Sequence, residues 1–407
     1  MSLDIQSIRS QFPALQRTVG DRPAVFLDGP AGSQVPECVI DAISGYLRGS
    51  NANNGGEFLT SRETGQLMHD ASMAMADLVG SDDPDSIVFG PNMTTLTFQF
   101  SRALAQTWEA GDEIVVTRLD HDANVWPWVM AARDAGVTVR YVPFHTGDCT
   151  LDMEAMAQAV GPRTRLVAVG AASNAVGTMN PVGEVARLAH AQGALVYVDA
   201  VHSAPHRLMD AAGWDADFVA FSAYKFYGPH VGIVHGRREL LASLPAYQVR
   251  PAQDSVPGRW STGTRNHEGM AGAMAAVDYL AALGKGATRR DRLQTAYADI
   301  AEHEGALCRS LIAGVHGVGG YRVLGITDPA RSDRVATLSI VHERHKPQAL
   351  HERLGESGIF SWAGHFYAVE VTAHLGRDPD GMLRLGLMHY NTQEEVDRVV
   401  HELLAIG

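Results

Sequence analysis

Residues 222–232 read SAYKFYGPHVG, and they directly follow the apolar run DFVAF at residues 217–221. The pattern predicts a buried strand that ends in the hydroxyl of Ser222 and the amine of Lys225, before a Gly-Pro turn. In open sheets of parallel strands, ligands bind at this edge. An amine held there is partly desolvated, which favours its neutral form, and it can form a Schiff base with a carbonyl compound. The alternative is an exposed loop lysine, because most lysines lie at the surface.

A second apolar stretch upstream, VYVDAVH at residues 196–202, predicts a strand that ends in the carboxylate of Asp199. By itself, Asp199 could equally cap the following helix. A lysine and a carboxylate at the ends of neighbouring strands meet the needs of pyridoxal 5'-phosphate, since the lysine holds the aldehyde and the carboxylate keeps the pyridine nitrogen protonated. The pair therefore predicts a pyridoxal phosphate site.

These two stretches resemble the cofactor motifs of the class V aminotransferases, in the cysteine desulfurase-like branch of the fold-type I pyridoxal phosphate enzymes. Four further segments resemble the same family in the same order along the chain: LDGPAG at residues 27–32, DHDAN at 120–124, SNAVGTMNP at 173–181 and RLGLMHYN at 384–391. The resemblance covers about the whole chain. It implies a homodimer with active sites at the subunit interface and a small amino acid as substrate.

Composition agrees with this interpretation. A chain of 407 residues, 45% hydrophobic and 19% charged, can bury a large core and is expected to form two domains of a globular protein. The net charge of −13 argues against a nucleic-acid partner. Three scattered cysteines show no metal-ligand spacing and favour a reducing cytoplasm. The start, MSLDIQ, and the lack of a long apolar run lead us to expect neither a signal peptide nor a membrane span.

Short apolar strands alternate with helical patterns over the first two thirds of the chain, which predicts a large, doubly wound, mainly parallel α/β domain over residues 16–264. A smaller α+β C-terminal domain is expected over residues 265–407, with the N-terminal segment 1–15 joined to it. Buried strands are expected at residues 25–28, 86–89, 113–117, 137–142, 166–170, 195–199, 217–221 and 232–235. A helix is expected at 181–192. For the small domain we expect helices at 267–283, 290–312 and 393–404 and strands at 336–341 and 383–387.

The cofactor phosphate is expected at a helix N-terminus, where free amide groups favour an anion. The sequence GPNMTT at residues 90–95 follows a predicted strand and opens a helix, so the backbone near Met93 and the side chain of Thr94 are candidates. Alternatively, Thr94 merely caps that helix. Ser222 would add a hydroxyl. The family resemblance implies that Thr264 reaches the phosphate of the neighbouring subunit.

The resemblance assigns three more residues to the cofactor, and a fourth, Tyr224, departs from the family and is a further candidate. His121 matches a histidine that stacks on the pyridine ring, although a structural histidine is the alternative. His202 stands where relatives bond the phenolic oxygen of the cofactor, and Asn174 lies near that oxygen and the substrate carboxylate. Tyr224 stands where desulfurases usually carry histidine; it either bonds the phosphate, shapes an aromatic substrate pocket with His365 and Tyr367, or serves packing.

Arg384 opens a predicted strand of the small domain. A guanidinium holds an α-carboxylate through two parallel hydrogen bonds, and the family uses an arginine at this place, although a surface ion pair is the alternative. Desulfurases of this branch carry a mobile cysteine in the loop before that strand. Here the loop reads SWAGHFYA at residues 361–368, with Tyr367 approximately where the cysteine would be. A phenol cannot take up sulfur, so we expect no cysteine persulfide.

The predicted chemistry begins with Lys225 as the base that removes the Cα proton of an amino acid held by Arg384 and Asn174. From the resulting carbanion, β-elimination, transamination and epimerisation remain open. A persulfide-independent C–S lyase, or a related β-eliminating enzyme, is the first choice, and transamination is the second. A catalytically retired interaction protein and a nucleotide-binding domain are disfavoured, because Lys225 and Asp199 are both present and GPAGS at residues 29–33 lacks the nucleotide-binding glycine pattern.

Overall fold

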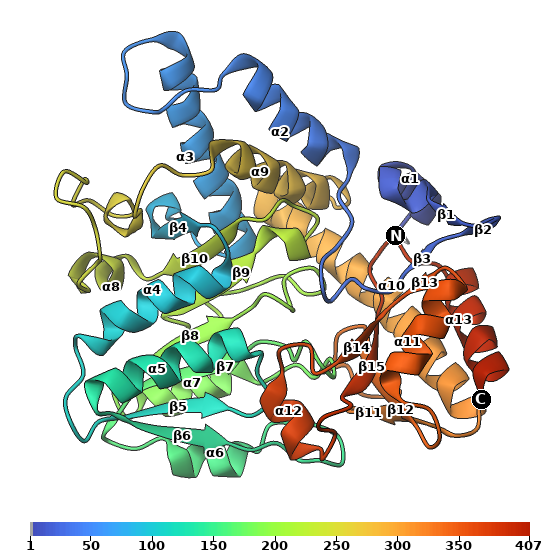
Figure 1. Cartoon of the computed structure of the whole chain (residues 1–407). Coiled ribbons are helices and arrows are strands. Elements are labelled where there is room, and N and C mark those ends of the chain that lie inside the picture. The colour runs from blue at the N-terminus through green and yellow to red at the C-terminus, as the bar shows by residue number, and fades with distance from the viewer. Residues whose placement is uncertain (1–2) are drawn as a thin grey trace.

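The large sheet carries the strand ends on which the predicted site depends. The computed structural model describes residues 3–407; Met1 and Ser2, which begin the predicted N-terminal segment, lie outside the described residues. Seven strands run in the order β4-β10-β9-β8-β7-β5-β6 (Figure 1). They are β4 (Ile87–Gly90), β10 (Gly232–Gly236), β9 (Phe218–Ser222), β8 (Leu195–Asp199), β7 (Thr164–Gly170), β5 (Glu113–Thr117) and β6 (Thr138–Val142). Strand β10 pairs antiparallel with β4 and β9, and the other pairs are parallel. This confirms the predicted, mainly parallel sheet.

Helices cover both faces of this sheet. Along β8, Val196 and Val198 face one hydrophobic core and Tyr197 faces the other, as the two-residue period of a strand requires. The first core includes residues of α3 (Leu59–Val79), α7 (Val182–His190) and α9 (His267–Ala282), and the second includes residues of α4 (Met93–Ala105) and α5 (Trp126–Ala135). Helix α7 confirms the helix expected at residues 181–192, and Gly193 just beyond it has a left-handed φ of +76°.

Strand β6 departs from the expected near-continuous burial. Thr138 and Arg140 are exposed, and only Val142 is fully buried. Among the described strands, β6 pairs with β5 alone, at the edge of the sheet. An edge strand presents part of its surface to solvent, so the expectation of burial was wrong for this element.

The C-terminal part of the chain forms a second, antiparallel sheet in the order β11-β12-β15-β14. Its strands are β11 (Tyr321–Leu324), β12 (Thr337–His342), β15 (Met382–Gly386) and β14 (Trp362–Gly364), and the helices beside it are α10 (Arg289–Gly317), α11 (Pro347–Glu356) and α13 (Gln393–Ile406). Helix α10 begins with a capping box in which Thr288 and Asp291 each accept a hydrogen bond from the other's backbone N–H, over 3.1 and 3.0 Å. This confirms a smaller α+β unit.

Two segments lie in other places than expected. Strand β3 (Val25–Phe26) does not join the large sheet but pairs in parallel with β13 (Ile359–Phe360) beside the small sheet. Helix α9 was assigned to the small domain, yet it packs against α2 (Glu37–Gly49) and α3 in the core of the large sheet. Its many alanine and glycine residues allow this close helix packing. Neither contact could be inferred from periodicity, because both join residues distant in sequence. The boundary at residues 264 and 265 remains a prediction.

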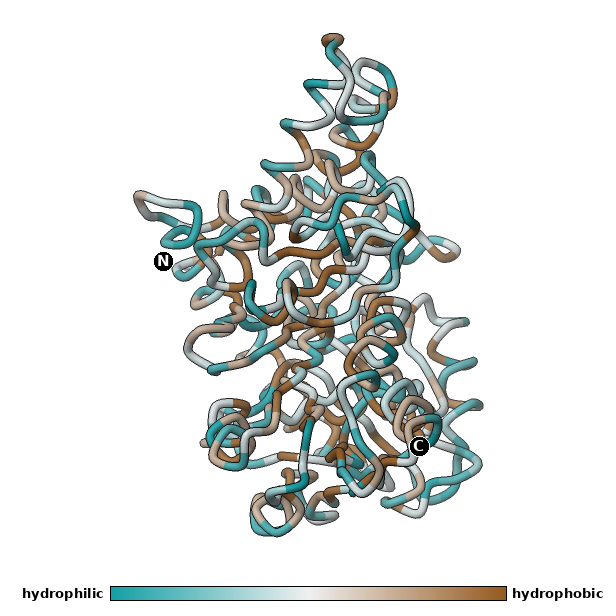
Figure 2. The backbone as a smooth tube through the Cα atoms, turned by 90° about the vertical axis from the view of Figure 1, so that its left-hand side faces the viewer, coloured by the Kyte–Doolittle hydropathy of each residue, from teal (hydrophilic) through white to brown (hydrophobic). Residues whose placement is uncertain are grey.

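Helices α2 and α3 project from the rest of the molecule at the top of both views (Figures 1 and 2). Five large apolar side chains on them and on the connection between them are exposed: Ile40, Leu47, Phe58, Leu59 and Met73. The remaining short elements are α1 (Ile5–Ser10), α6 (Met153–Ala159), α8 (Arg238–Ser243), α12 (Val369–His374), β1 (Thr18–Val19), β2 (Arg22–Pro23), η1 (Pro13–Gln16), η2 (Pro84–Ser86), η3 (Asp122–Asn124), η4 (Ala223–Lys225) and η5 (Gly258–Trp260). Within residues 3–407, no helix is long and apolar enough to cross a membrane.

Candidate active site

A cavity of about 670 Å³ lies where the carboxyl ends of β5, β8 and β9 face the small sheet. This size suits a cofactor together with a small substrate. Every predicted site residue except Thr264 lines it: Met93, Thr94, His121, Asn174, Asp199, His202, Ser222, Tyr224, Lys225, His365, Tyr367 and Arg384. Thr264 is exposed in the loop between η5 and α9. The structure therefore brings the predicted set together, while the role of each residue remains a prediction.

Lys225 and Asp199 meet because they follow two adjacent parallel strands, β9 and β8. Burial lowers the pKa of Lys225 to about 7, the Arg384 charge lowers it in the same direction, and Asp199 opposes both. Burial raises the pKa of Asp199 to about 6, while the Val201 N–H and the Lys225 charge lower it. Burial thus favours the uncharged form of both groups, and their mutual attraction opposes this. The Lys225 amine donates a hydrogen bond to the carbonyl of Pro30.

The N-terminus of α4 opens into the same cavity. Helix α4 begins at Met93, and the side chain of Asn92 caps it by accepting a hydrogen bond from the Thr95 N–H over 2.8 Å. The alternative in which Thr94 is the cap is therefore wrong. The Met93 N–H donates to Ser222 Oγ over 3.1 Å, which joins the helix terminus to the end of β9. A helix N-terminus beside a hydroxyl is suited to an anionic group.

His121 follows β5 and is held by its own loop. Its Nδ1 accepts a hydrogen bond from the Ala123 N–H over 3.0 Å, and its ring stacks on that of Tyr367 with 5.6 Å between centroids. Burial lowers the pKa of His121 to about 3, and the charges of Lys225 and Arg384 act in the same direction. The ring is neutral, so it offers a planar, uncharged surface to the cavity.

His202 is buried beside the cavity, and its Nε2 lies 3.1 Å from the hydroxyl oxygen of Thr337 on β12. Burial lowers the pKa of His202 well below its ordinary value, and the nearby His206, Arg384, Lys225 and His121 act in the same direction. Thr337 was not anticipated from the sequence, because it comes from the other sheet.

Arg384 extends from β15 of the small sheet and is only 4% exposed. It donates a hydrogen bond to the Asn174 carbonyl over 2.9 Å, and its guanidinium lies 4.3 Å from the ring centre of Phe366. Burial lowers the pKa of Arg384 to about 9, although the nearby Asp28 opposes this. Arg384 has no carboxylate within ion-pair distance among residues 3–407, which excludes the surface ion pair considered above.

The loop at residues 365–367 is held over the cavity by backbone hydrogen bonds. Asn174 Nδ2 donates to the Phe366 carbonyl over 2.9 Å, and the Asp122 N–H donates to the Tyr367 carbonyl over 2.7 Å. Phe366 and Tyr367 both have left-handed φ values, +54° and +58°, which non-glycine residues rarely adopt. Tyr367 remains 69% exposed. A short loop with this conformation is kept in place by its contacts with the large sheet.

Tyr224 packs on two neighbours. Its ring stacks on His230 with 5.0 Å between centroids, and the Lys225 amine lies 4.8 Å from its ring centre. These contacts agree with the packing role that was one of the three alternatives, and they also place the phenol at the cavity wall.

Sequence reasoning missed Asp120 as a site residue, although it belongs to the DHDAN segment. It lines the cavity, and its carboxylate accepts hydrogen bonds from the Gly170 N–H over 2.7 Å and from Asn124 Nδ2 over 3.2 Å. Burial raises the pKa of Asp120 well above its ordinary value, and the charge of Asp199 raises it further. Its place immediately before His121, at a strand end, was the available signal. Trp126 and Trp362, which also line the cavity, had no such signal.

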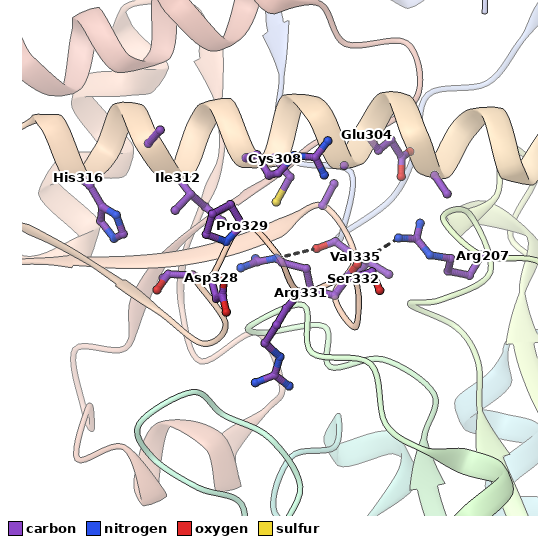
Figure 3. A pocket seen from close by; sticks show the side chains of 17 residues that line it. Arg207, Glu304, Cys308, Ile312, His316, Asp328, Pro329, Arg331, Ser332 and Val335 are labelled. Carbon is purple, nitrogen blue, oxygen red and sulfur yellow. Dashed lines mark hydrogen bonds between the residues drawn. The ribbon is translucent and has the colours of Figure 1, made fainter. Parts of the chain in front are cut away.

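A second cavity, of about 270 Å³, lies between α10 and the 327–336 segment (Figure 3). Four arginines line it, and the three whose contacts are defined already have partners. Arg334 donates to the carbonyls of Ile326, Val335 and Thr337, Arg331 pairs with Asp148 and Asp333, and Arg207 donates to the carbonyls of His206 and Arg334. No predicted site residue lies there.

The main cavity fits pyridoxal phosphate by the chemistry of its donors. The phosphate would meet the α4 N-terminus and Ser222, the pyridine nitrogen would meet Asp199, and the aldehyde would meet Lys225. Asn174 Oδ1 is also buried there and has no hydrogen-bond partner in the described part of the chain, which leaves an acceptor for a bound group. Among residues 3–407 there is no cluster of His, Cys, Asp and Glu that could hold a metal ion.

Comparison with known proteins agrees with this geometry. The family model "Aminotransferase class-V" matches residues 25–399. A probable cysteine desulfurase of Vibrio cholerae serotype O1 is 32% identical over 415 residues and covers 98% of each chain. A cysteine desulfurase of Dickeya dadantii is 32% identical and covers 97% of this chain and 95% of its own.

Solved structures show the same fold. A cysteine desulfurase of Escherichia coli superposes with a TM-score of 0.85 at 25% identity over the whole of both chains. The apo cysteine desulfurase of Thermococcus onnurineus superposes with a TM-score of 0.90 at 23% identity, covering 100% of this chain and 98% of its own. The chain belongs to the class V aminotransferase family. It is a pyridoxal phosphate-dependent enzyme of the cysteine desulfurase-like kind, which confirms the predicted class, fold and cofactor.

Proposed function

We propose that this enzyme acts at Cα and Cβ of a sulfur-containing amino acid and eliminates the β-substituent without forming a cysteine persulfide. The main observation in support of this proposal is the position of the cysteine thiols. The chain has three cysteines, Cys38, Cys149 and Cys308, and none of them lines the main cavity. Tyr367 occupies the cavity wall approximately where a desulfurase cysteine is expected.

The chemistry of the three thiols supports this proposal. The thiolate is the form that attacks sulfur. Burial raises the pKa of Cys149 to about 12, and burial also raises the pKa of Cys308. Cys38 on α2 is an exposed residue, but its sulfur is partly covered, and this partial burial raises the pKa of its thiol as well. None of the three has the lowered thiol pKa that a sulfur acceptor requires.

The side chains of the cavity suit the first steps of such a reaction. Arg384 would bind the substrate carboxylate through its guanidinium, with Asn174 beside it. Lys225, whose pKa is lowered to about 7, would remove the Cα proton, and Asp199 would keep the cofactor nitrogen protonated. When bound, the cofactor supplies an electron sink for the Cα carbanion.

The test is product analysis with the holoenzyme and an S-alkyl-L-cysteine. Elimination with water yields one thiol, one pyruvate and one ammonium ion for each substrate consumed. We expect these three products in equal amounts, and no protein persulfide after incubation with L-cysteine. A Lys225→Ala protein should fold and lack turnover. Persulfide on any of the three cysteines would contradict the proposal, and a keto acid that retains sulfur would favour transamination, the second prediction from the sequence.

We further infer that the active unit is a homodimer. The exposed apolar side chains of α2 and the start of α3 support this, because such groups mark contact surfaces. The loop that carries Thr264 leads into α9, which contacts α2: Tyr46 on α2 and His267, the first residue of α9, are joined by a hydrogen bond of 3.2 Å. Thr264 would then extend toward the phosphate of the neighbouring subunit.

A further inference from the structure

Thr337 contacts the cofactor cavity indirectly, through His202. It lies on β12 of the small sheet, and its hydroxyl oxygen is 3.1 Å from His202 Nε2 of the large domain. Thr337 is fully buried, and His202 is 4% exposed. Two buried polar groups from different sheets are thus paired with each other.

The direction of this hydrogen bond follows from the needs of the buried hydroxyl. Among residues 3–407, the Thr337 hydroxyl has no other hydrogen-bond partner. If Nε2 carried a proton and donated it, the hydroxyl proton would be left buried with no acceptor, which is costly. If the hydroxyl donates to Nε2, both groups are satisfied. The second arrangement requires the imidazole proton to be on Nδ1.

The other ring nitrogen faces the cavity. His202 Nδ1 has no hydrogen-bond partner among the described residues, and it keeps some accessible surface. His202 lines the main cavity but not the second one, so this accessible surface faces the main cavity. A proton on Nδ1 is consequently presented to the cofactor space.

The surroundings of His202 keep the ring neutral. Burial lowers its pKa well below the ordinary value, and His206, Arg384, Lys225 and His121 all act in the same direction. The His206 ring contacts the His202 ring edge to face with 5.5 Å between centroids, and its Nδ1 bonds Glu304 over 2.7 Å rather than His202. A neutral imidazole has one proton, so the choice of nitrogen decides whether it is a donor or an acceptor.

We propose that Thr337 is a positioning residue that holds His202 as the Nδ1–H tautomer and so makes it a hydrogen-bond donor toward the phenolic oxygen of the cofactor. The sheet register supports this role. On β12 and β15, Thr337 pairs with Gly386 and Ser339 pairs with Arg384, so Thr337 and Arg384 lie on the same face of the small sheet, and Arg384 lines the cavity itself. The small sheet therefore acts on the cofactor through His202 and on the substrate through Arg384. The inference rests on the proposed role of His202, and it is independent of which reaction follows.

The tautomer can be measured directly. In holoenzyme labelled with ¹⁵N-histidine, the His202 ring signals are assigned by their loss in the His202→Gln protein. We expect a protonated Nδ1 and an unprotonated Nε2 at neutral pH, in the holoenzyme and after the cofactor has been removed. A proton on Nε2 in either form, or a doubly protonated ring, would overturn the proposal whether or not the enzyme is a lyase.

Matched variants test the role of the hydroxyl. Thr337→Val keeps the shape and removes the donor, whereas Thr337→Ser keeps the donor. A hydrogen bond donated to the phenolic oxygen lowers the pKa of the lysine–cofactor imine. Because Thr337→Val should weaken that hydrogen bond, we expect it to raise the pH of the cofactor's absorbance transition by about 0.5–1 unit. Thr337→Ser should titrate like the natural enzyme. Equal titration of the folded valine variant and the natural enzyme would refute the proposal. If Thr337→Val fails to fold, the nitrogen measurement on the natural enzyme and Thr337→Ala still decide it.

Discussion

Lys225 and Arg384 are both cations of the main cavity, and burial acts on them in the same direction. It lowers the pKa of Lys225 to about 7 and that of Arg384 to about 9. A general base works in its unprotonated form, whereas a carboxylate-binding guanidinium works in its charged form. Loss of the Lys225 proton therefore sets the acid limit of the pH range of activity, because the guanidinium of Arg384 keeps its charge.

From the lowered pKa of Lys225 we expect kcat to rise with pH through about 7, as Lys225 loses its proton, while Arg384 stays charged over the same range. Steady-state rates measured from acid to alkaline pH with one substrate provide the test. A kcat that is constant between pH about 6 and about 8 would exclude Lys225 as the rate-determining base.

Arg384→Gln should lower kcat/KM for an amino acid about 10- to 100-fold, because charge-assisted hydrogen bonds to the carboxylate are lost. The matching amine without a carboxylate should lose much less, so the ratio of the two substrates isolates the contact. Arg133→Gln, on the exposed face of α5 where Arg133 pairs with Asp134, is the control and should leave both rates unchanged. Similar losses for both substrates would show that Arg384 acts on the fold and not on the carboxylate.

At the scale of elements, the phosphate end of the cavity depends on the close approach of β10 to the start of α4. A Cβ atom on Gly232 would lie 2.2 Å from the backbone carbonyl carbon of Asn92. Gly232 also pairs with Ser222 across the sheet. Gly232, the last residue of the 222–232 stretch, is therefore a glycine because a larger residue would collide with the Asn92 backbone.

Gly232→Ala should lower the free energy of unfolding by about 1–3 kcal/mol, because the added methyl group displaces the Asn92 backbone. It should also weaken retention of the cofactor phosphate, measured as cofactor lost on dialysis. Gly45→Ala, in the exposed interior of α2 with nothing within 4 Å of the added atom, is the matched control. It should be neutral or stabilising by about 0.5–1 kcal/mol through helix propensity. Equal denaturation midpoints for the two variants would contradict this account of Gly232.

At the scale of the whole molecule, Thr264 is the one predicted site residue that does not line its own chain's cavity. If it serves the neighbouring subunit, each active site needs Lys225 from one chain and Thr264 from the other. Two differently inactivated chains can then complement each other in a mixed dimer.

Thr264→Glu should place a negative charge beside the phosphate and prevent cofactor binding in the partner site. Neither Thr264→Glu nor Lys225→Ala alone should turn over. After unfolding together and refolding, random pairing should restore about a quarter of the natural activity, because half of the dimers are mixed and each has one complete site. No recovery, with dimers confirmed by sedimentation, would place Thr264 outside the partner site.

Much of this architecture could be predicted because local sequence patterns determine where the strands and helices begin and end. The strands around Asp199 and Lys225 are continuous apolar runs, and polar residues follow where each strand ends. The α4 N-terminus was anticipated in the same way, although the cap proved to be Asn92 rather than Thr94. Helix α9 and strand β3 were placed wrongly, because their partners lie far away along the chain.

The sequence alone determined the family, the cofactor and the residues assembled at the strand ends, since hydrophobic period and short motifs are properties of neighbouring residues. Only the tertiary structure decided the directions in which the pKa values of Lys225, Asp120 and Arg384 shift, because these depend on burial and on neighbouring charges. It also decided the contact of Thr337 with His202, because a hydrogen bond between residues of different sheets exists only after the two sheets have packed together.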